Sequence, residues 1–105
     1  MIKTELYFGR RIELMDNEFA LVKLDAWKKF KIAEVDSRID GYTELFANGS
    51  WRGTIEEAFV LVIIWDEADV SRAISSKIDK IRCAYCRAFG QESVMRIDHD
   101  VYVSF

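Results

Sequence analysis

The sequence has no proline and only five glycines among its 105 residues. Segments rich in proline, or in glycine and serine, are typical of linkers and disordered tails, so their scarcity indicates one continuously folded chain. A chain of this length corresponds to a single domain, and we expect residues 1–105 to form it. The composition therefore predicts one hydrophobic core without internal linkers.

Long hydrophobic runs are also missing. The longest run, Ala58–Trp65, has the length of a strand, whereas a membrane-spanning helix needs about 20 apolar residues. The first residues, Met1–Glu5, contain no apolar stretch of the kind found in export signals. We therefore expect a cytoplasmic protein that does not interact with a membrane.

Basic residues are not in excess. Fifteen basic and 18 acidic side chains give a net charge of −3, and both signs are spread along the chain. Proteins that bind nucleic acid through its phosphates generally show a basic excess or a basic stripe. The charge balance therefore argues against a nucleic-acid partner.

The chain has only two cysteines and one histidine, so few side chains are available as metal ligands or as redox-active thiols. Cys83 and Cys86 form a C-x-x-C pair, but we place it near the C-terminal end of a helix, where the helix dipole opposes thiolate formation. A zinc site would need further ligands. His99, between Asp98 and Asp100, is expected in a solvated turn, because flanking residues of a strand point to opposite faces. We expect neither a metal nor a cofactor.

The hydrophobic periodicities predict six elements in the order β-α-β-β-α-β. Asn48-Gly49 predicts a hairpin turn between the two middle strands, and Gly90 predicts the end of the second helix. This order is typical of an α+β, ferredoxin-like fold, in which a four-stranded antiparallel sheet carries both helices on one face. The expected strands are residues 4–12, 42–47, 58–65 and 93–105, and the expected helices are residues 25–37 and 70–89.

The two helices differ in how clearly the sequence defines them. The first is expected to begin with Asp25 as its N-cap and to bury Trp27, Phe30 and Ala33. The segment Asp16–Leu24 before it suits either a hairpin or the start of that helix. In the second helix, apolar side chains recur every three or four residues and predict one buried stripe: Val70, Ile74, Ile78, Ile81, Tyr85 and Ala88.

The strand Phe59–Trp65 is apolar on both of its sides. A strand with one face open to water should alternate between apolar and polar residues, so both faces of this one are expected to be dry. Neighbouring strands could add Tyr42 or Phe46 to the uncovered side. Soluble monomers rarely expose large apolar patches, so we expect a cover. The residues predicted for the covered face are Tyr7, Val60, Val62, Ile64 and Tyr102.

Three covers are possible for this face. A second copy of the chain, packed sheet to sheet, is our leading interpretation, which makes the protein a homodimer. The segment Glu13–Leu24 could instead fold over the sheet of its own chain. A different protein partner or a flat apolar ligand is the third possibility.

Two arginine pairs could bind an anion. An arginine beside an aromatic ring can bind a carboxylate or phosphate with both of its donor groups while the ring packs on the guanidinium, a pattern that Arg10-Arg11 and Trp51-Arg52 suit. We favour the plainer interpretation, in which the arginines form exposed salt bridges and Trp51 closes the edge of the core.

Three segments are distinctive when taken together: Thr4–Gly9, Gly49–Arg52 and Ile78–Val94, of which the last ends in the sequence FGQESV. On these segments the chain resembles a family of small bacterial and phage proteins described only as a domain of unknown function. The resemblance extends over nearly the whole chain and implies an α+β fold with no assigned activity. On the matching positions, it implies these candidates for a ligand pocket: Tyr7, Trp51, Arg52, Tyr85, Gln91 and Ser93.

Tyr85 belongs both to these candidates and to the stripe of the second helix. Its ring is therefore expected to face the sheet, and its hydroxyl needs a hydrogen-bond partner. Gln91 or Ser93 could provide that partner, or they could satisfy the carbonyl groups at the end of the helix.

These observations lead to three hypotheses about function. The first is a homodimeric binding or interaction module with a site for a small ligand or a protein partner at its rim. The second is a cofactor-free enzyme of the dimeric α/β-barrel kind, with Tyr85 or Arg52 inside a closed cavity of a few hundred Å³. The third, suggested by the phage relatives, is an inhibitor that blocks a host protein through an acidic surface.

Overall fold

The computed structural model describes residues 1–105 as an α+β structure built on a four-stranded sheet. The sheet consists of β1 (Ile2–Gly9), β4 (Thr43–Trp51), β5 (Thr54–Trp65) and β6 (Met95–Asp100). The strands lie in the order β4-β5-β1-β6, and each neighbouring pair is antiparallel. The predicted antiparallel sheet of four strands is confirmed.

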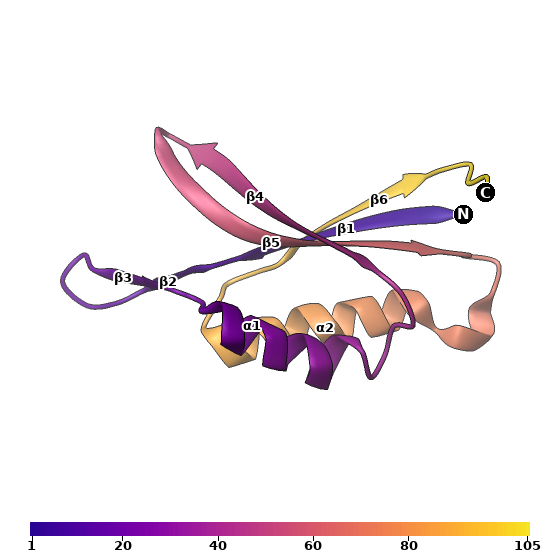
Figure 1. Cartoon of the computed structure of the whole chain (residues 1–105), viewed down its shortest axis with the longest axis horizontal. Helices are drawn as coiled ribbons and strands as arrows, with labels where there is room; N and C mark the ends of the chain where they lie inside the picture. The colour runs from indigo at the N-terminus through magenta and orange to yellow at the C-terminus, as the bar shows by residue number, and fades with distance from the viewer.

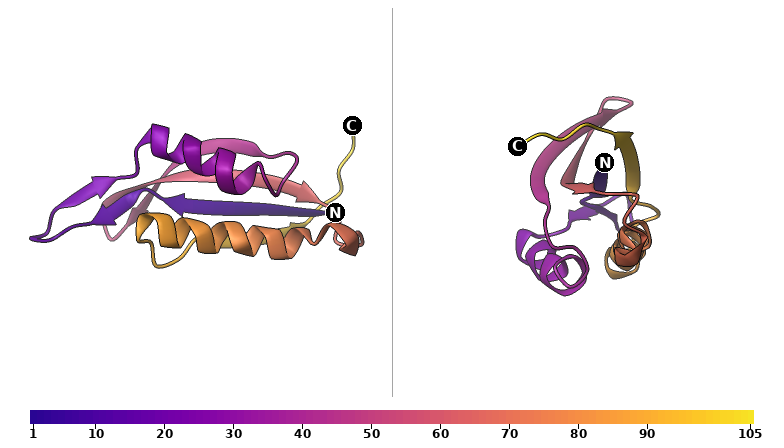
Figure 2. Two further views of the ribbon diagram at one scale, coloured as in Figure 1. Left: turned by 90° about the horizontal axis from the view of Figure 1, so that it is seen from below. Right: turned by 90° about the vertical axis from the view of Figure 1, so that its right-hand side faces the viewer.

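Both helical segments lie on the same face of the sheet (Figures 1 and 2). The first consists of α1 (Leu24–Phe30) followed directly by a π-helix, η1 (Lys31–Val35), and it connects β1 to β4. The second consists of a short 3₁₀ helix, η2 (Val70–Arg72), and α2 (Ile74–Phe89), and it connects β5 to β6. None of these helices has the length and apolar character needed to cross a membrane.

The segment after β1 forms a hairpin rather than the start of a helix. Its strands, β2 (Arg11–Glu13) and β3 (Phe19–Leu21), are antiparallel. Between them, Asp16 and Asn17 both adopt a φ of 61°, a left-handed conformation that Asp and Asn tolerate well. The hairpin projects beyond the end of β1 (Figure 1), so it does not fold over the open face of its own sheet, and that candidate cover was wrong.

The core lies between the helices and the sheet and is rich in aromatic rings. β1 alternates, with Leu6 and Phe8 buried under the helices and Tyr7 on the opposite face. The ring of Trp27 stacks on that of Phe59, with 4.4 Å between their centroids. Burying a large apolar side chain stabilises a fold by about 1.5–3 kcal/mol, so this aromatic layer holds α1 firmly against the sheet.

The turn between β4 and β5 lies at Arg52-Gly53, not at the predicted Asn48-Gly49. Both turn residues have positive φ angles, 50° and 79°, as a two-residue turn of type I′ requires. The register of the ribbon explains the difference, because Phe46 lies opposite Phe59. A turn at Asn48-Gly49 would leave the apolar part of β5 without partner residues in β4.

The π-helix changes which side chains the first helical segment buries. Trp27 and Phe30 are buried as predicted, but Ala33 is exposed and Val35 is buried instead. The backbone N–H of Asp36 donates to the carbonyl five residues earlier, at 2.8 Å. The wider turn rotates the following side chains relative to an α-helix, and for this reason the prediction for Ala33 was wrong.

The helix ends agree only partly with the predictions. Lys23 is the N-cap of α1, and Asp25 lies inside its first turn. Because α2 begins at Ile74, Val70 lies outside it and is exposed. Gly90 adopts a φ of 63° and ends α2 as predicted. The buried stripe of α2 consists of Ile78, Ile81 and Tyr85, whereas the predicted stripe residue Ala88 is exposed.

The last strand is shorter than expected. β6 runs through Asp98, His99 and Asp100 without a turn and ends there, because its partner β1 begins at Ile2. His99 is therefore an exposed strand residue opposite Lys3, not part of a solvated turn. The segment after it, residues 101–105, turns away from β6 and crosses the end of the sheet on the side away from the helices (Figure 2).

A polar cluster fastens β6 to α2. Thr4 is the one buried polar residue, and its hydroxyl accepts a hydrogen bond from Trp65 Nε1 (2.8 Å) and donates one to Asp98 (2.6 Å). The Arg96 guanidinium donates to Asp98 (3.1 Å) and to Asp79 of α2 (3.0 Å). Burial alone would raise the pKa of Asp98, but the hydrogen bonds from Thr4 and Arg96 and the Arg96 charge lower it.

Candidate functional site

The candidate site is the face of the sheet that points away from the helices, here called the open face. Residues directly opposite each other in an antiparallel pair share a face, so the register defines which side chains it carries. They come from all four strands: Thr43, Leu45, Ala47, Ala58, Val60, Val62, Ile64, Lys3, Glu5, Tyr7, Met95, Ile97 and His99.

Apolar side chains form two columns on the open face, one along β4 and β5 and one along β6. Leu45, Ile64 and Met95 are 51%, 42% and 53% exposed. Val60 lies between Leu45 and Tyr7 in the middle of the face and is almost fully buried by its neighbours. The predicted apolar character of this side of β5 therefore matches its position, and nothing within the chain covers most of it.

Four of the five residues predicted for this face lie on it, and Tyr102 is the exception. Tyr102 lies outside the sheet, in the segment that follows β6, and its side chain is exposed. The prediction that Phe46 or Tyr42 adds to this side was wrong. Phe46 lies opposite Phe59 on the helix side, and the Tyr42 hydroxyl donates to an aspartate after η1. The side chains predicted and found on the open face are Tyr7, Val60, Val62 and Ile64.

A polar stripe along β1 separates the two apolar columns. The Tyr7 hydroxyl donates to Glu5 at 2.9 Å, and the Lys3 ammonium lies 3.4 Å from the other carboxylate oxygen of Glu5. The hydrogen bond from Tyr7 lowers the pKa of Glu5, and the same bond raises the pKa of Tyr7. Glu5 is thus held as an ordered carboxylate between the two apolar columns of the open face.

The sequence analysis did not identify Lys3, Glu5 or His99 as residues of the candidate site. The alternation of β1 could have identified Lys3 and Glu5, because it assigns both residues to the same face as Tyr7. His99 could not be assigned in the same way, because the strand it belongs to was expected to be interrupted there.

Tyr85 and Gln91 meet the end of β1 at a second location. The Tyr85 hydroxyl donates to the carbonyl of Gly9 at 2.8 Å, and the Gln91 amide donates to the carbonyl of Arg11 at 2.7 Å. Of the two roles predicted for Gln91 and Ser93, neither residue is the partner of the Tyr85 hydroxyl, but the Gln91 amide also lies 3.5 Å from the carbonyl of Phe89 at the end of α2 and donates to it. Burial raises the pKa of Tyr85, which keeps its hydroxyl protonated as a donor. A Cβ atom at Gly9 would lie 3.3 Å from Gln91 Oε1, so a larger residue there would crowd this side chain.

An open hollow of about 470 Å³ lies beside this contact and is lined by Gln91, Ser93 and the two neighbouring arginines. Arg10 donates to the carbonyl of Val22 at 2.9 Å and lies over the ring of Phe59. Arg11 pairs with a glutamate of β2 at 2.7 Å and lies over the ring of a phenylalanine of β3. Both guanidinium groups already have partners within the chain, so they hold the base of the hairpin in place.

Trp51 and Arg52 occupy a third location, at the tip of the β4–β5 ribbon. Both are exposed, and the Arg52 guanidinium lies 5.5 Å from the centre of the Trp51 ring. The six candidate ligand residues therefore divide among three places. Tyr7 lies on the open face, Trp51 and Arg52 lie at the ribbon tip, and the others lie near the end of α2: Tyr85, Gln91 and Ser93.

A family model described as "Protein of unknown function (DUF3574)" matches residues 3–105. The match covers almost the entire chain, and the predicted resemblance to a family of unknown function is confirmed. No curated protein and no solved structure matches the chain.

Proposed function

Because this chain belongs to the DUF3574 family, whose description names no activity, we propose a function from its geometry. The chain is a ferredoxin-like interaction module that forms a homodimer through its open face. Helical connections from β1 to β4 and from β5 to β6, within the order β4-β5-β1-β6, support the ferredoxin-like classification. The exposure of Leu45, Ile64 and Met95 on one face is the observation that carries the functional proposal.

The size of the open face sets the strength expected of this dimer. Along the eight residues of β1, a length of about 27 Å, four strands about 4.8 Å apart span an area of roughly 400 Å². Such an area lies within the range of the largest patches on ordinary monomers and is about half of the ~800 Å² that each partner buries in a standard interface, so a weak dimer is expected. The segment after β6 crosses the same side of the sheet and, with Tyr102 92% exposed, enlarges the contact.

A second copy of the chain is favoured as the partner because the polar stripe is complementary to itself. When two open faces pack with their β1 strands antiparallel, Lys3 can face Glu5 of the partner subunit. The two-fold symmetry of such a dimer repeats the same contact on the other side. A wholly apolar partner would instead bury the Lys3–Glu5 ion pair and offer no further partner to either charge, which is costly.

Sedimentation velocity from micromolar to millimolar concentration tests the proposal. The wild-type chain is expected to convert from monomer to dimer, and Val62→Lys is expected to remain monomeric with unchanged helical circular dichroism. The lysine is compatible with the folded monomer because Val62 lies opposite Glu5. Ile32→Lys is the matched control, since Ile32 is 59% exposed on η1, away from the sheet, and should leave the dimer intact. A wild-type chain that stays monomeric throughout would contradict the homodimer.

The Glu5–Tyr7 pair supports a second candidate, the cofactor-free enzyme. A carboxylate that a tyrosine hydrogen bond holds in its ionised form can stabilise positive charge on a substrate once a dimer encloses it. A thermal-shift screen of metabolites tests this candidate, because a ligand at 100 times its Kd adds about 2.7 kcal/mol to stability. A ligand whose shift disappears in Tyr7→Phe, which removes the hydrogen bond to Glu5 but keeps its charge for the dimer, would support it.

A further inference from the structure

Charge is separated between the helices and the rest of the molecule. The residues of α1, η1 and α2 include seven basic and three acidic side chains, a net charge of +4. The remaining residues include eight basic and 15 acidic side chains, a net charge of −7 within the chain total of −3. The helices are thus cationic in a protein that is acidic overall, which favours an anionic partner between them.

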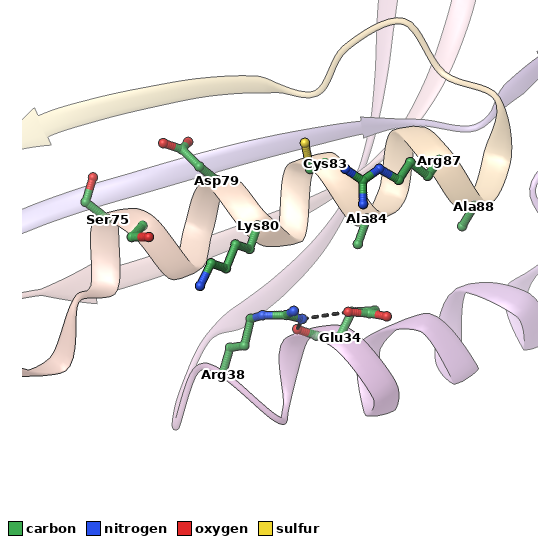
Figure 3. Close-up of a pocket in the computed structure, with 10 residues that line it drawn as sticks. Glu34, Arg38, Ser75, Asp79, Lys80, Cys83, Ala84, Arg87 and Ala88 are labelled. Atoms are coloured by element: carbon green, nitrogen blue, oxygen red, sulfur yellow. Dashed lines mark hydrogen bonds and ion pairs between the residues drawn. The ribbon is translucent and has the colours of Figure 1, made fainter.

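An open groove of about 1050 Å³ lies between the two helical segments (Figure 3). One wall is formed by α2 from Ser75 to Ala88, a length of about 20 Å at the rise of an α-helix. The other wall carries Glu34 of η1 and Arg38 just after it. Between them, small side chains such as Ala84 leave room for another backbone to approach.

Two cations in this groove have no carboxylate partner. Arg38 is held by Glu34, whose carboxylate accepts at 2.6 Å. Asp79 is held from the other side by arginines 82 and 96, at 2.8 Å and 3.0 Å, so it is not free to neutralise the groove. Lys80 and Arg87 take part in none of the ion pairs of the chain. Lys80 extends from α2 toward Arg38 (Figure 3).

We propose that this groove binds an acidic segment of another protein as an amphipathic helix lying along α2. Lys80 and Arg87 are seven residues apart, so they lie on one face of α2 and about 10.5 Å apart along its axis. A partner helix with two acidic residues seven positions apart has the same spacing between its carboxylates. A segment of about 13 residues fills the length of the groove.

The groove suits a helix better than a nucleic acid or a small anion. A nucleic-acid backbone carries a phosphate at every nucleotide and is bound through many cations, whereas this groove offers only Lys80 and Arg87 as cations without a carboxylate partner. A small anion would occupy only a fraction of an open groove about 20 Å long. A helix with spaced acidic residues meets Lys80 and Arg87 and leaves neutral positions opposite Glu34 and Asp79.

The test uses an alanine-rich peptide of about 16 residues with glutamates seven positions apart, a length at which isolated helices become stable. Binding to the ¹⁵N-labelled chain is followed by amide chemical shifts, and the Kd is measured by fluorescence anisotropy. The control peptide has the same composition but places the glutamates five positions apart, on different faces of its helix. We expect the first peptide to shift amides of η1 and α2 and the control to bind more weakly.

Charge-reversal variants locate the site. Lys80→Glu together with Arg87→Glu is expected to raise the Kd about tenfold, or 1.4 kcal/mol, as the loss of two exposed charge pairs requires. The matched control is Lys28→Glu together with Lys29→Glu, an equal change on α1 outside the groove, which should change the Kd less than twofold.

Four results would overturn the proposal. They are equal weakening by both double variants, equal binding of both peptides, tighter binding of a single-stranded oligonucleotide at the same amides, and saturation of those amides by inorganic phosphate. Because the groove and the open face lie on opposite sides of the molecule, these results are independent of the proposed homodimer (Figure 2).

Discussion

Replacing Thr4 by valine tests the polar cluster that joins β6 to α2. The two side chains have nearly the same shape, so the change removes a hydroxyl without opening a cavity. Two hydrogen bonds are lost, one from Trp65 Nε1 and one to Asp98. At about 0.5–1.5 kcal/mol each, and with Asp98 partly exposed, the free energy of unfolding at pH 7 should fall by about 1–2 kcal/mol.

Urea denaturation followed by tryptophan fluorescence measures this loss. With a slope of about 1.5 kcal/mol per molar urea, the midpoint of Thr4→Val should lie about 1 M below that of the wild type. Thr54→Val is the control, because Thr54 is exposed at the start of β5 and its hydroxyl makes no hydrogen bond within the chain. Its unfolding free energy should change by less than about 0.5 kcal/mol.

Acidification separates the contribution of Asp98 from that of Trp65. The pKa of Asp98 is lower in the folded state than in the unfolded chain, so its contribution is present above the unfolded pKa. It is lost as the pH falls through the folded pKa. Without the Thr4 hydroxyl, the pKa of Asp98 moves back toward its ordinary value of about 3.9, and the variant loses less stability in acid. A difference between wild type and Thr4→Val that is the same at pH 7 and pH 3 would refute this reasoning.

Three further changes probe other parts of the structure. Tyr85→Phe removes the hydrogen bond to the Gly9 carbonyl but keeps the ring, so thermal melting should show a loss of about 1 kcal/mol, and an unchanged melt would contradict that role. Arg52→Asn should raise the free energy of unfolding, measured by urea denaturation, by about 0.5–1 kcal/mol, because asparagine tolerates the positive φ of this turn position better than arginine. A urea midpoint below that of the wild type would argue against backbone strain at Arg52. Burial, followed by the hydrogen bond to Asp36, raises the pKa of Tyr42 to about 12, above its unfolded value of about 10. The stability that Tyr42 contributes is therefore complete below pH 10 and is lost as the pH rises through 12, so the urea midpoint of Tyr42→Phe should fall less than that of the wild type over this range.

Much of the sheet could be predicted because its pattern is local. The alternation of β1 assigns Leu6 and Tyr7 to opposite faces, and the two apolar sides of β5 mark it as a central strand. The end of α2 follows from Gly90, a residue suited to a left-handed conformation. In each case a few consecutive residues carry the information.

The errors arise where distant parts of the chain compete with a local signal. Asn48-Gly49 is a strong turn signal by itself, but pairing Phe46 with Phe59 requires the turn to lie four residues later. The burial of Val35 depends on a π-helix that no periodicity of 3.6 residues can indicate.

The candidate sites were harder to predict than the fold, because each is formed by residues that only the structure brings together. The six candidate ligand residues belong to three segments of the sequence. Each segment lies at a different place in the structure, so the six residues do not form one pocket. The basic residues of the groove are spread through a chain of mixed charge, so the sequence shows no stripe. Only the packing of α1 and α2 on the same side of the sheet makes that side cationic.

The π-helix also makes η1 a natural place for the chain to change length. Lys31–Val35 wind through a wider turn than an α-helix would use, so the segment contains a residue that regular winding does not need. Removing exposed Ala33 would allow this stretch to return to α-helical winding while Val35 and Ile39 keep their places under the sheet. The same deletion within α2 would turn Ile81 and Tyr85 out of the core. Single-residue shortening should therefore be accommodated in the first helical segment far better than in the second.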